Sequence, residues 1–128
     1  MNYDKLNDYE LINLAKESDD ESKNIIIEKY MPLINKMASK MFVFCKNNGL
    51  EKSDLIQEGM IALTNAIENF DNTKDTIFYT YATACIQRKL ISEIIKANRN
   101  KLVIFAVNKV VPYKIACHFE FKFWQLCL

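Results

Sequence analysis

The feature that most constrains the fold is an apolar stripe in the middle of the chain. Ile56, Met60, Leu63, Ile67 and Phe70 follow one another in steps of four, three, four and three residues. This spacing places them on one face of an α-helix, which must be buried against another element. The chain has only two Gly and two Pro in 128 residues, so few positions can interrupt long helices. The sequence therefore predicts an all-α fold.

Capping and turn residues divide this all-α chain into a compact bundle of about five helices. Asn7 and Glu10 have the spacing of a capping box, which predicts that the first helix begins beside them. Ser53 is the candidate N-cap of the fourth helix, and the fifth is expected over about residues 76–97. Breaks are predicted at residues 17–20, at Pro32 as a new first turn or a kink, and at residues 47–49 and 71–75.

The helical pattern stops after Lys101. Residues 102–111 are mostly apolar and β-branched, and residues 118–128 are rich in aromatics, without clear caps or turns. We therefore divide the chain into a helical domain over residues 1–101 and an atypical C-terminal tail over residues 102–128. The composition of the tail suggests an out-of-frame extension, which the nucleotide sequence beyond the stop codon, read in all three frames, would test.

The cysteines point to free thiols in a reducing cytoplasm. They are Cys45, Cys85, Cys117 and Cys127, no two of which have CxxC spacing, and the N-terminus lacks the apolar run of a secretory signal. Cys117 and His118 raise the reading of a cysteine-dependent enzyme, but no acid or oxyanion arrangement accompanies them. A single His without a CxxC pair also argues against a metal site. We therefore expect no catalytic residue, no metal and no cofactor.

Charge is distributed unevenly on the two sides of the loop at residues 71–75. Residues 51–75 carry six acids and two lysines, a net charge of −4, whereas residues 76–101 carry five bases and one acid, a net charge of +4. This asymmetry indicates two different partners, one of them a polyanion. On charge alone, the alternative is that both segments are ordinary solvated helix faces. The longest apolar run, residues 102–107, is too short to cross a bilayer, so no membrane partner is expected.

Two short motifs carry more information than helix packing requires. The first, at residues 54–59, places carboxylates at a helix N-terminus and is either an ordinary acidic first turn or a polar docking face. The second, at residues 78–83, supplies aromatic rings that can stack on unpaired nucleobases. The lysine and arginine side chains that follow it can neutralise phosphates. For Phe78 the alternative is a core position, because it shares a helical stripe with Ile86. For Tyr81 the basic neighbours favour contact with DNA.

These motifs, in this order, resemble the second conserved region of the bacterial sigma-70 family, over about residues 7–101. The sequence Asp-Leu-Ile-Gln-Glu-Gly at 54–59 resembles the family's core-binding helix, and Phe-Tyr-Thr-Tyr-Ala-Thr at 78–83 resembles its DNA-melting segment. Residues 91–101 resemble the segment that recognises the promoter −10 element. The stretches at 57–61 and 84–86 are most similar to the sporulation and stationary-phase sigma-H type.

The resemblance implies a role for each matching residue. Those implied to contact the clamp helices of the largest subunit of core RNA polymerase are Asp54, Gln57 and Glu58. Those implied to lie against the opened non-template strand of the −10 element are Phe78, Thr80 and Tyr81, with Tyr81 beside a flipped base. Arg88 and Ile91 are implied to face the upstream edge of this element. The residues implied to hold backbone phosphates are Lys89, Lys96, Arg99 and Lys101.

The chain also departs from the family pattern. Primary sigma factors carry a Trp pair where this chain has Ala84 and Cys85, a Gln where it has Arg88, and a Thr where it has Ile91. These differences imply an alternative sigma factor with weaker melting and a different −10 preference. Nothing after Lys101 matches the family's helix-turn-helix that reads the −35 element, so we expect a chain that is truncated after the second region.

The function that the resemblance implies is that of a cytoplasmic sigma factor, which is not an enzyme. It would bind core RNA polymerase and recognise and melt the −10 element in transcription initiation. An anti-sigma factor is a further candidate partner. The second reading is a protein-interaction fragment that binds core polymerase without initiating transcription, and open-complex formation on a promoter would distinguish the two.

Overall fold

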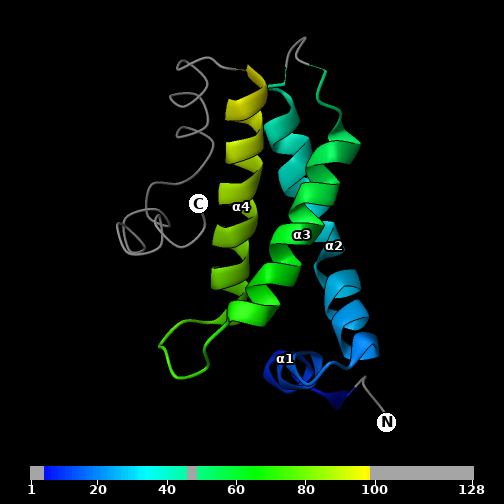
Figure 1. Ribbon diagram of the computed structural model, residues 1–128, viewed down its shortest axis with the longest axis vertical. Helices are drawn as coiled ribbons and strands as arrows, with labels where there is room; N and C mark the ends of the chain where they lie inside the picture. Colours follow the sequence, from blue (N-terminus) through cyan, green and yellow to red (C-terminus); the bar gives the residue numbers. More distant parts are fainter. Residues whose placement is uncertain (1–4, 46–48, 99–128) are drawn as a thin grey trace.

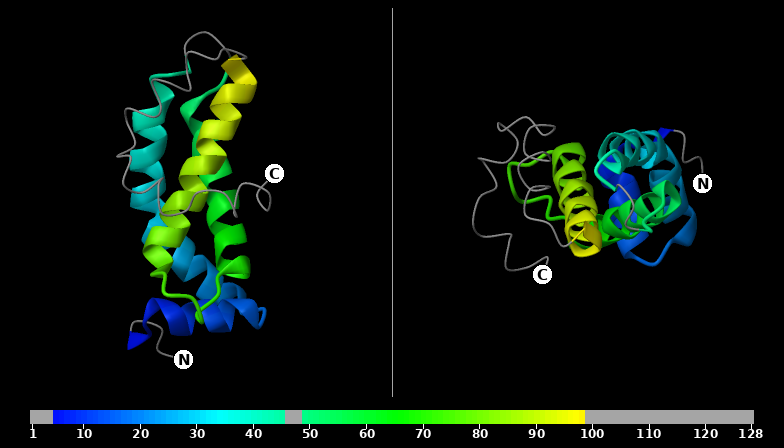
Figure 2. Two further views of the ribbon diagram at one scale, coloured as in Figure 1. Left: turned by 90° about the vertical axis from the view of Figure 1, so that its left-hand side faces the viewer. Right: turned by 90° about the horizontal axis from the view of Figure 1, so that it is seen from above.

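The computed structural model describes residues 5–45 and 49–98, which contain four helices and the loops between them. The helices are α1 (Asp8–Lys16), α2 (Asp20–Phe42), α3 (Lys52–Asn69) and α4 (Phe78–Asn98). The helices α2, α3 and α4 run side by side along the long axis, and α1 lies across the end where α3 stops and α4 begins (Figure 1, Figure 2). Within these residues there is no strand, so the predicted all-α class is confirmed. The expected tail at residues 102–128 lies outside the described residues.

The prediction of about five helices is corrected to four for the described residues, because α2 continues through Pro32. Proline has no backbone N–H to donate to the carbonyl four residues earlier, so it weakens the helix locally. The first part of α2 is inclined to its second part (Figure 2, left). Even so, side chains at four-residue spacing stay buried on both sides of the proline: Ile26, Tyr30, Ile34 and Ala38. Their packing explains why α2 remains one helix.

Capping residues set the starts of the helices. The predicted capping box is confirmed at α1, where the Asn7 N–H donates to Glu10 Oε2 and the Glu10 N–H donates to Asn7 Oδ1, both at 2.9 Å. At α3 the N-cap is Glu51 rather than the predicted Ser53. The Glu51 N–H donates to Asp54 Oδ2 at 2.8 Å, whereas the Ser53 hydroxyl donates to the Glu51 carboxylate at 3.3 Å. The cap moves because Asp54 offers a carboxylate acceptor at the right distance along the chain.

The central helix α3 packs against both α2 and α4. Of the predicted stripe, Leu63, Ile67 and Phe70 are buried, whereas Ile56 and Met60 are only half-buried. The buried face is completed by residues that the stripe did not contain: Leu55, Gly59, Ala62 and Ala66. The buried face of α3 is wider than the predicted stripe, because α3 packs against α2 and α4 and also contacts α1.

Gly59 marks a close approach between α3 and its neighbours. A Cβ atom built on Gly59 would lie 2.7 Å from Cγ2 of Ile34 on α2 and 3.7 Å from Cγ2 of Ile86 on α4. Because packed carbon atoms do not approach to 2.7 Å, this spacing of α2 and α3 requires a residue without a side chain.

Among the described residues, none of the helices has both the length and the apolar character that a membrane crossing needs.

Candidate functional site

An aromatic cluster holds the first turn of α4, at the end of the bundle that α1 covers. The Phe78 ring meets Phe70 edge-on with 5.1 Å between ring centroids, and it meets Tyr30 edge-on at 5.5 Å. Edge-to-face pairs of this kind stabilise beyond their buried area. Phe78 is only 1% exposed, so no face of its ring is open to a base. The structure therefore corrects the expectation that Phe78 touches DNA and places it in the core, the alternative that its helical stripe left open.

The neighbours of Phe78 divide into a buried and an exposed group. Tyr81 is only 8% exposed, because its ring also packs in the aromatic cluster. Thr80 is exposed. Tyr79 and Ile77, neither of which the sequence reasoning selected, are 54% and 65% exposed. Once Phe78 is placed in the core, the next residue must point about 100° away around the helix, and this signal would have identified Tyr79.

Tyr30 of α2 supports the exposed ring of Tyr79. The Tyr30 hydroxyl donates to the Asp8 carboxylate of α1 at 3.1 Å, and Lys29 forms an ion pair with the same carboxylate. Burial, followed by the negative charge of Asp8, raises the pKa of Tyr30 well above its usual value, so its hydroxyl remains a donor. The ring centroids of Tyr30 and Tyr79 are 6.2 Å apart. Through this contact, α1 and α2 help to set the position of Tyr79.

The three predicted docking residues of α3 do not form one cluster. Asp54 is half-buried and accepts the N–H of Glu51, so its carboxylate is part of the helix cap. Gln57 is exposed and lines a groove between α2 and α3. Glu58 is directed to α4, where its carboxylate lies 3.2 Å from the ammonium of Lys89. Of the three residues, only Gln57 is exposed.

The groove beside Gln57 is the second feature that the sequence reasoning missed. Its lining is mostly apolar and comes from one residue of α2 and five of α3: Ile27, Gln57, Met60, Ile61, Thr64 and Asn65. Ile61 is 50% exposed, which is high for a branched apolar side chain. Ile61 is continuous with the half-buried Ile27 and Met60 in this groove, and a contiguous apolar area with polar neighbours is typical of a surface that binds another protein. No signal in the sequence pointed to this groove, because the stripe assigned Met60 to the core, whereas the structure leaves it half-buried.

The predicted phosphate-binding residues of α4 are partly neutralised by acids. Lys89 pairs with Glu58 at 3.2 Å and with Glu93 at 3.1 Å, and Lys96 pairs with Glu93 at 2.9 Å. Hydrogen bonding to Glu93, and secondarily to Glu58, outweighs burial and raises the pKa of Lys89. Burial raises the pKa of Glu93, but the hydrogen bonds from Lys96 and Lys89 outweigh it and leave that pKa lowered. Lys89 and Glu93 are therefore both charged at neutral pH.

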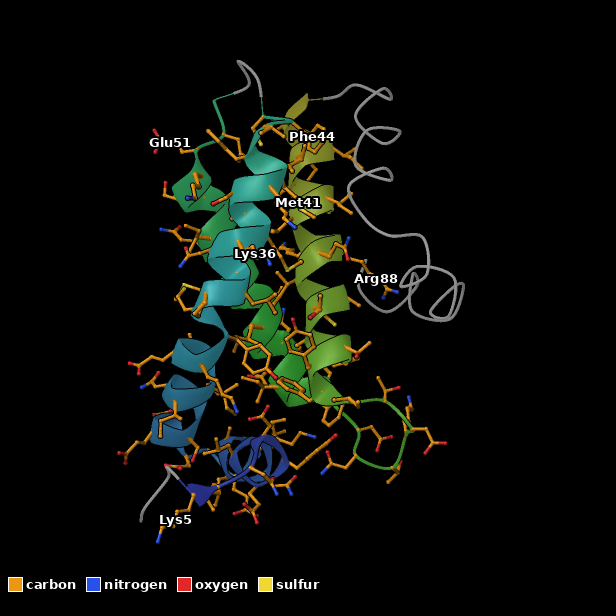
Figure 3. All side chains as sticks on the ribbon, turned by 180° about the vertical axis from the view of Figure 1, so that it is seen from behind. Lys5, Lys36, Met41, Phe44, Glu51 and Arg88 are labelled. Atoms are coloured by element: carbon orange, nitrogen blue, oxygen red, sulfur yellow. The ribbon has the colours of Figure 1, made fainter. Side chains whose placement is uncertain are left out.

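The remaining predicted contacts belong to the second half of α4 and to the residues that follow it in the sequence. Arg88 and Ile91 are half-buried, and Figure 3 shows Arg88 pointing away from α2 and α3. Lys96 is exposed near the end of the helix. Arg99 and Lys101 lie outside the described residues. The structure thus leaves Tyr79, Thr80, Arg88, Ile91 and Lys96 along α4, with the groove beside Gln57 on α3.

Comparison with known proteins gives a family for this arrangement. Residues 26–100 match the family model of sigma-70 region 2. The sigma-H factor of Bacillus licheniformis is 32% identical over 97 residues, which are 76% of this chain and 42% of that protein. The sigma-E factor of Clostridium acetobutylicum is 30% identical over 106 residues, or 83% of this chain and 42% of that protein. A sigma-C factor of a Nostoc species is 37% identical over 97 residues, or 75% of this chain and 22% of that protein.

The match and the relatives agree on the same stretch of the chain. The family model covers most of α2 and all of α3 and α4, which carry the groove and the α4 residues described above. This chain spans about two fifths or less of the length of the three relatives named. Because the matched residues make up more than half of the chain, it belongs to the sigma-70 region 2 family.

Proposed function

We propose that this chain acts as a sigma factor of the sigma-H-like, alternative kind, which binds core RNA polymerase and recognises and opens the promoter −10 element. The observation that carries the proposal is the match of residues 26–100 to sigma-70 region 2. The similarity to sigma-H factors supports the finer assignment. The chain would contribute binding and strand separation, and the polymerase would perform the chemistry.

The docking surface for the clamp helices of the polymerase is proposed to be the α2–α3 groove with its acidic edge. Gln57 offers an exposed amide, and Ile61 offers apolar area beside it. Glu58 and Asp54 add negative charge toward the start of α3. An apolar centre with a polar rim is the usual composition of a specific protein interface.

The DNA surface is proposed to comprise the exposed first turn of α4, where Tyr79 lies beside Tyr30 of α2, and the face of the helix that carries Arg88, which is nine residues and therefore about 180° further around. Tyr79 is its accessible aromatic platform, and a stacked base contributes roughly 1–3 kcal/mol, which offsets much of the cost of unpairing one base. Tyr81 and Thr80 would lie beside the separated strand, and Arg88 with Ile91 would face the upstream edge of the element. The cations proposed to contact phosphates are Lys96, Arg99 and Lys101.

Docking is tested by measuring the affinity of the full chain for core polymerase with fluorescence anisotropy. Gln57→Ala and Ile61→Ala are expected to weaken binding, because both remove exposed groups of the groove. Asn24→Ala, which removes an exposed amide outside the groove, is the matched control and should bind normally. Unchanged affinity for both groove variants would refute this docking surface.

Strand opening is tested with a promoter that carries 2-aminopurine, a fluorescent base, in the −10 element. Tyr79→Ala is expected to reduce the fluorescence gain of the complex with core polymerase, while docking stays normal. Phe42→Ala is the control, because Phe42 is also an exposed aromatic (39%) but lies at the other end of the bundle. Equal fluorescence gain in Tyr79→Ala and the unmodified chain would argue against the aromatic platform.

The second candidate function is a module that docks on core polymerase without opening DNA. The observation that favours it is the neutralisation of Lys89 by Glu58 and Glu93, which reduces the positive charge of α4. The two assays above separate the candidates. Normal docking without any fluorescence gain on promoters supports the docking module, whereas docking with a fluorescence gain supports the sigma factor.

A further inference from the structure

The ion pair between Glu58 and Lys89 joins the two proposed binding helices. The ammonium of Lys89 on α4 lies 3.2 Å from the carboxylate of Glu58 on α3 and 3.1 Å from that of Glu93, one turn further along α4. The side chains of Lys89, Glu58 and Glu93 are 35%, 30% and 19% exposed. They are thus accessible to a partner, yet sheltered enough from water for their charges to interact.

The pairing changes what Lys89 can offer to a polyanion. Glu58, Lys89, Glu93 and Lys96 form a chain of alternating charges with two acids, two bases and no net charge. A phosphate that approached Lys89 would meet two carboxylates within 3.2 Å of its ammonium. Lys89 therefore adds little to the positive potential of α4.

The pairing also changes what Glu58 can offer to a protein. A carboxylate on a docking surface is most useful against a cationic group of the partner. The Glu58 carboxylate already forms an intramolecular ion pair with Lys89. Any partner cation that binds Glu58 must therefore replace Lys89 or share the carboxylate with it.

We infer that Lys89 is a positioning residue that holds Glu58 and competes with a cationic group of core polymerase for its carboxylate. This inference rests on the proposed docking function and assigns Lys89 to the docking surface instead of to DNA phosphates. Docking would release Lys89 from Glu58. Binding of Glu58 on α3 to the polymerase would therefore change the charge that α4 presents.

Affinity for core polymerase tests the inference through the sign of the effect. Lys89→Met keeps the aliphatic stem but removes the internal competitor, so core binding is expected to become about two- to five-fold tighter, the range that corresponds to a partly exposed ion pair. Loss of folding can only weaken binding, so a gain cannot come from a damaged helix. Lys36→Met is the matched control, because Lys36 is an exposed lysine of α2 that belongs neither to this chain of charges nor to the groove.

A second variant carries the opposite expectation. Glu93→Gln removes the carboxylate that shares Lys89, so Lys89 should hold Glu58 more firmly and core binding should weaken about two-fold. Affinity that does not rise in Lys89→Met, or that does not fall in Glu93→Gln, overturns the inference.

Glu58→Gln separates this inference from the proposed function. If Glu58→Gln alone leaves core binding unchanged, then Glu58 is not a polymerase contact and the docking proposal fails at this residue. If Glu58→Gln weakens binding while Lys89→Met does not strengthen it, the docking proposal stands and only the competition by Lys89 is refuted. Glu58→Gln added to Lys89→Met should abolish the gain, because the carboxylate that was released is then absent.

Discussion

Gly59→Ala tests whether α2 and α3 are held as closely as the structure indicates. The new Cβ would lie 2.7 Å from Cγ2 of Ile34, well inside the contact distance of two carbon atoms, and 3.7 Å from Cγ2 of Ile86, an ordinary contact. The Cγ2 methyl of Ile34 is bonded directly to Cβ, so it cannot move aside without turning the whole side chain or shifting α2. The strain should therefore appear between α2 and α3 rather than between α3 and α4.

Two opposing effects decide how much Gly59→Ala changes the free energy of unfolding. Alanine in a helix interior is favoured over glycine by about 1 kcal/mol. Overpacking a tight core costs about 1–3 kcal/mol. Because the contact is shorter than packed cores allow and Gly59 is buried, the cost should exceed the gain, and we expect a net loss of about 1 kcal/mol in the free energy of unfolding.

Urea denaturation followed by circular dichroism measures this loss, and a double-mutant cycle assigns it to Ile34. Ile34→Leu removes the Cγ2 methyl at nearly constant volume and should cost less than about 1.5 kcal/mol alone. In that background Gly59→Ala should stop destabilising, since the contacting methyl is gone. Destabilisation of equal size in both backgrounds, or a stabilisation of about 1 kcal/mol in the native background, would refute the close approach.

Three further predictions concern particular side chains. Phe78→Ala should lower the free energy of unfolding by about 3–5 kcal/mol, whereas Tyr79→Ala should cost less than about 1.5 kcal/mol, as urea melts can measure. Asp54→Ala should cost about 1 kcal/mol of stability through the lost cap, whereas Asp54→Asn, which keeps an acceptor oxygen, should cost less; docking assays should therefore use Asp54→Asn. Because its pairing lowers the pKa of Glu93, this group stabilises the fold above the ordinary glutamate pKa and loses that contribution as pH falls, so thermal melts of Glu93→Gln should decline less steeply below about pH 5.

The fold could be predicted from the sequence where the signal is local. The capping box at Asn7 and the helical spacing of apolar residues depend on neighbours within four positions, and the all-α class follows from them. Pro32 is local too, but its effect depends on how well the flanking turns are packed. The buried residues of α2 on both sides outweigh the missing hydrogen bond, and the sequence alone does not show that balance.

The site could be predicted less completely, because its details depend on contacts between helices. The resemblance directs attention to α3 and α4, yet it does not say which face of each helix is buried. Glu58 and Lys89 are 31 positions apart, and each was assigned to a different partner, whereas the structure pairs them with each other. No spacing rule within a helix can reveal such a contact, because it depends on how α3 and α4 are placed relative to each other.

The aromatic motif of α4 illustrates why a helix cannot use every residue of a motif for binding. Successive residues of a helix are separated by about 100°, so the residues of the motif at 78–83 cannot all face the same side of α4. Phe78 and Tyr81 are packed against Phe70, which fixes the rotation of the helix, and this rotation turns Tyr79 outward. The buried aromatics thus set the orientation of the exposed one. A variant that loosens the cluster, such as Phe70→Leu, should consequently weaken strand opening even though Phe70 touches no DNA.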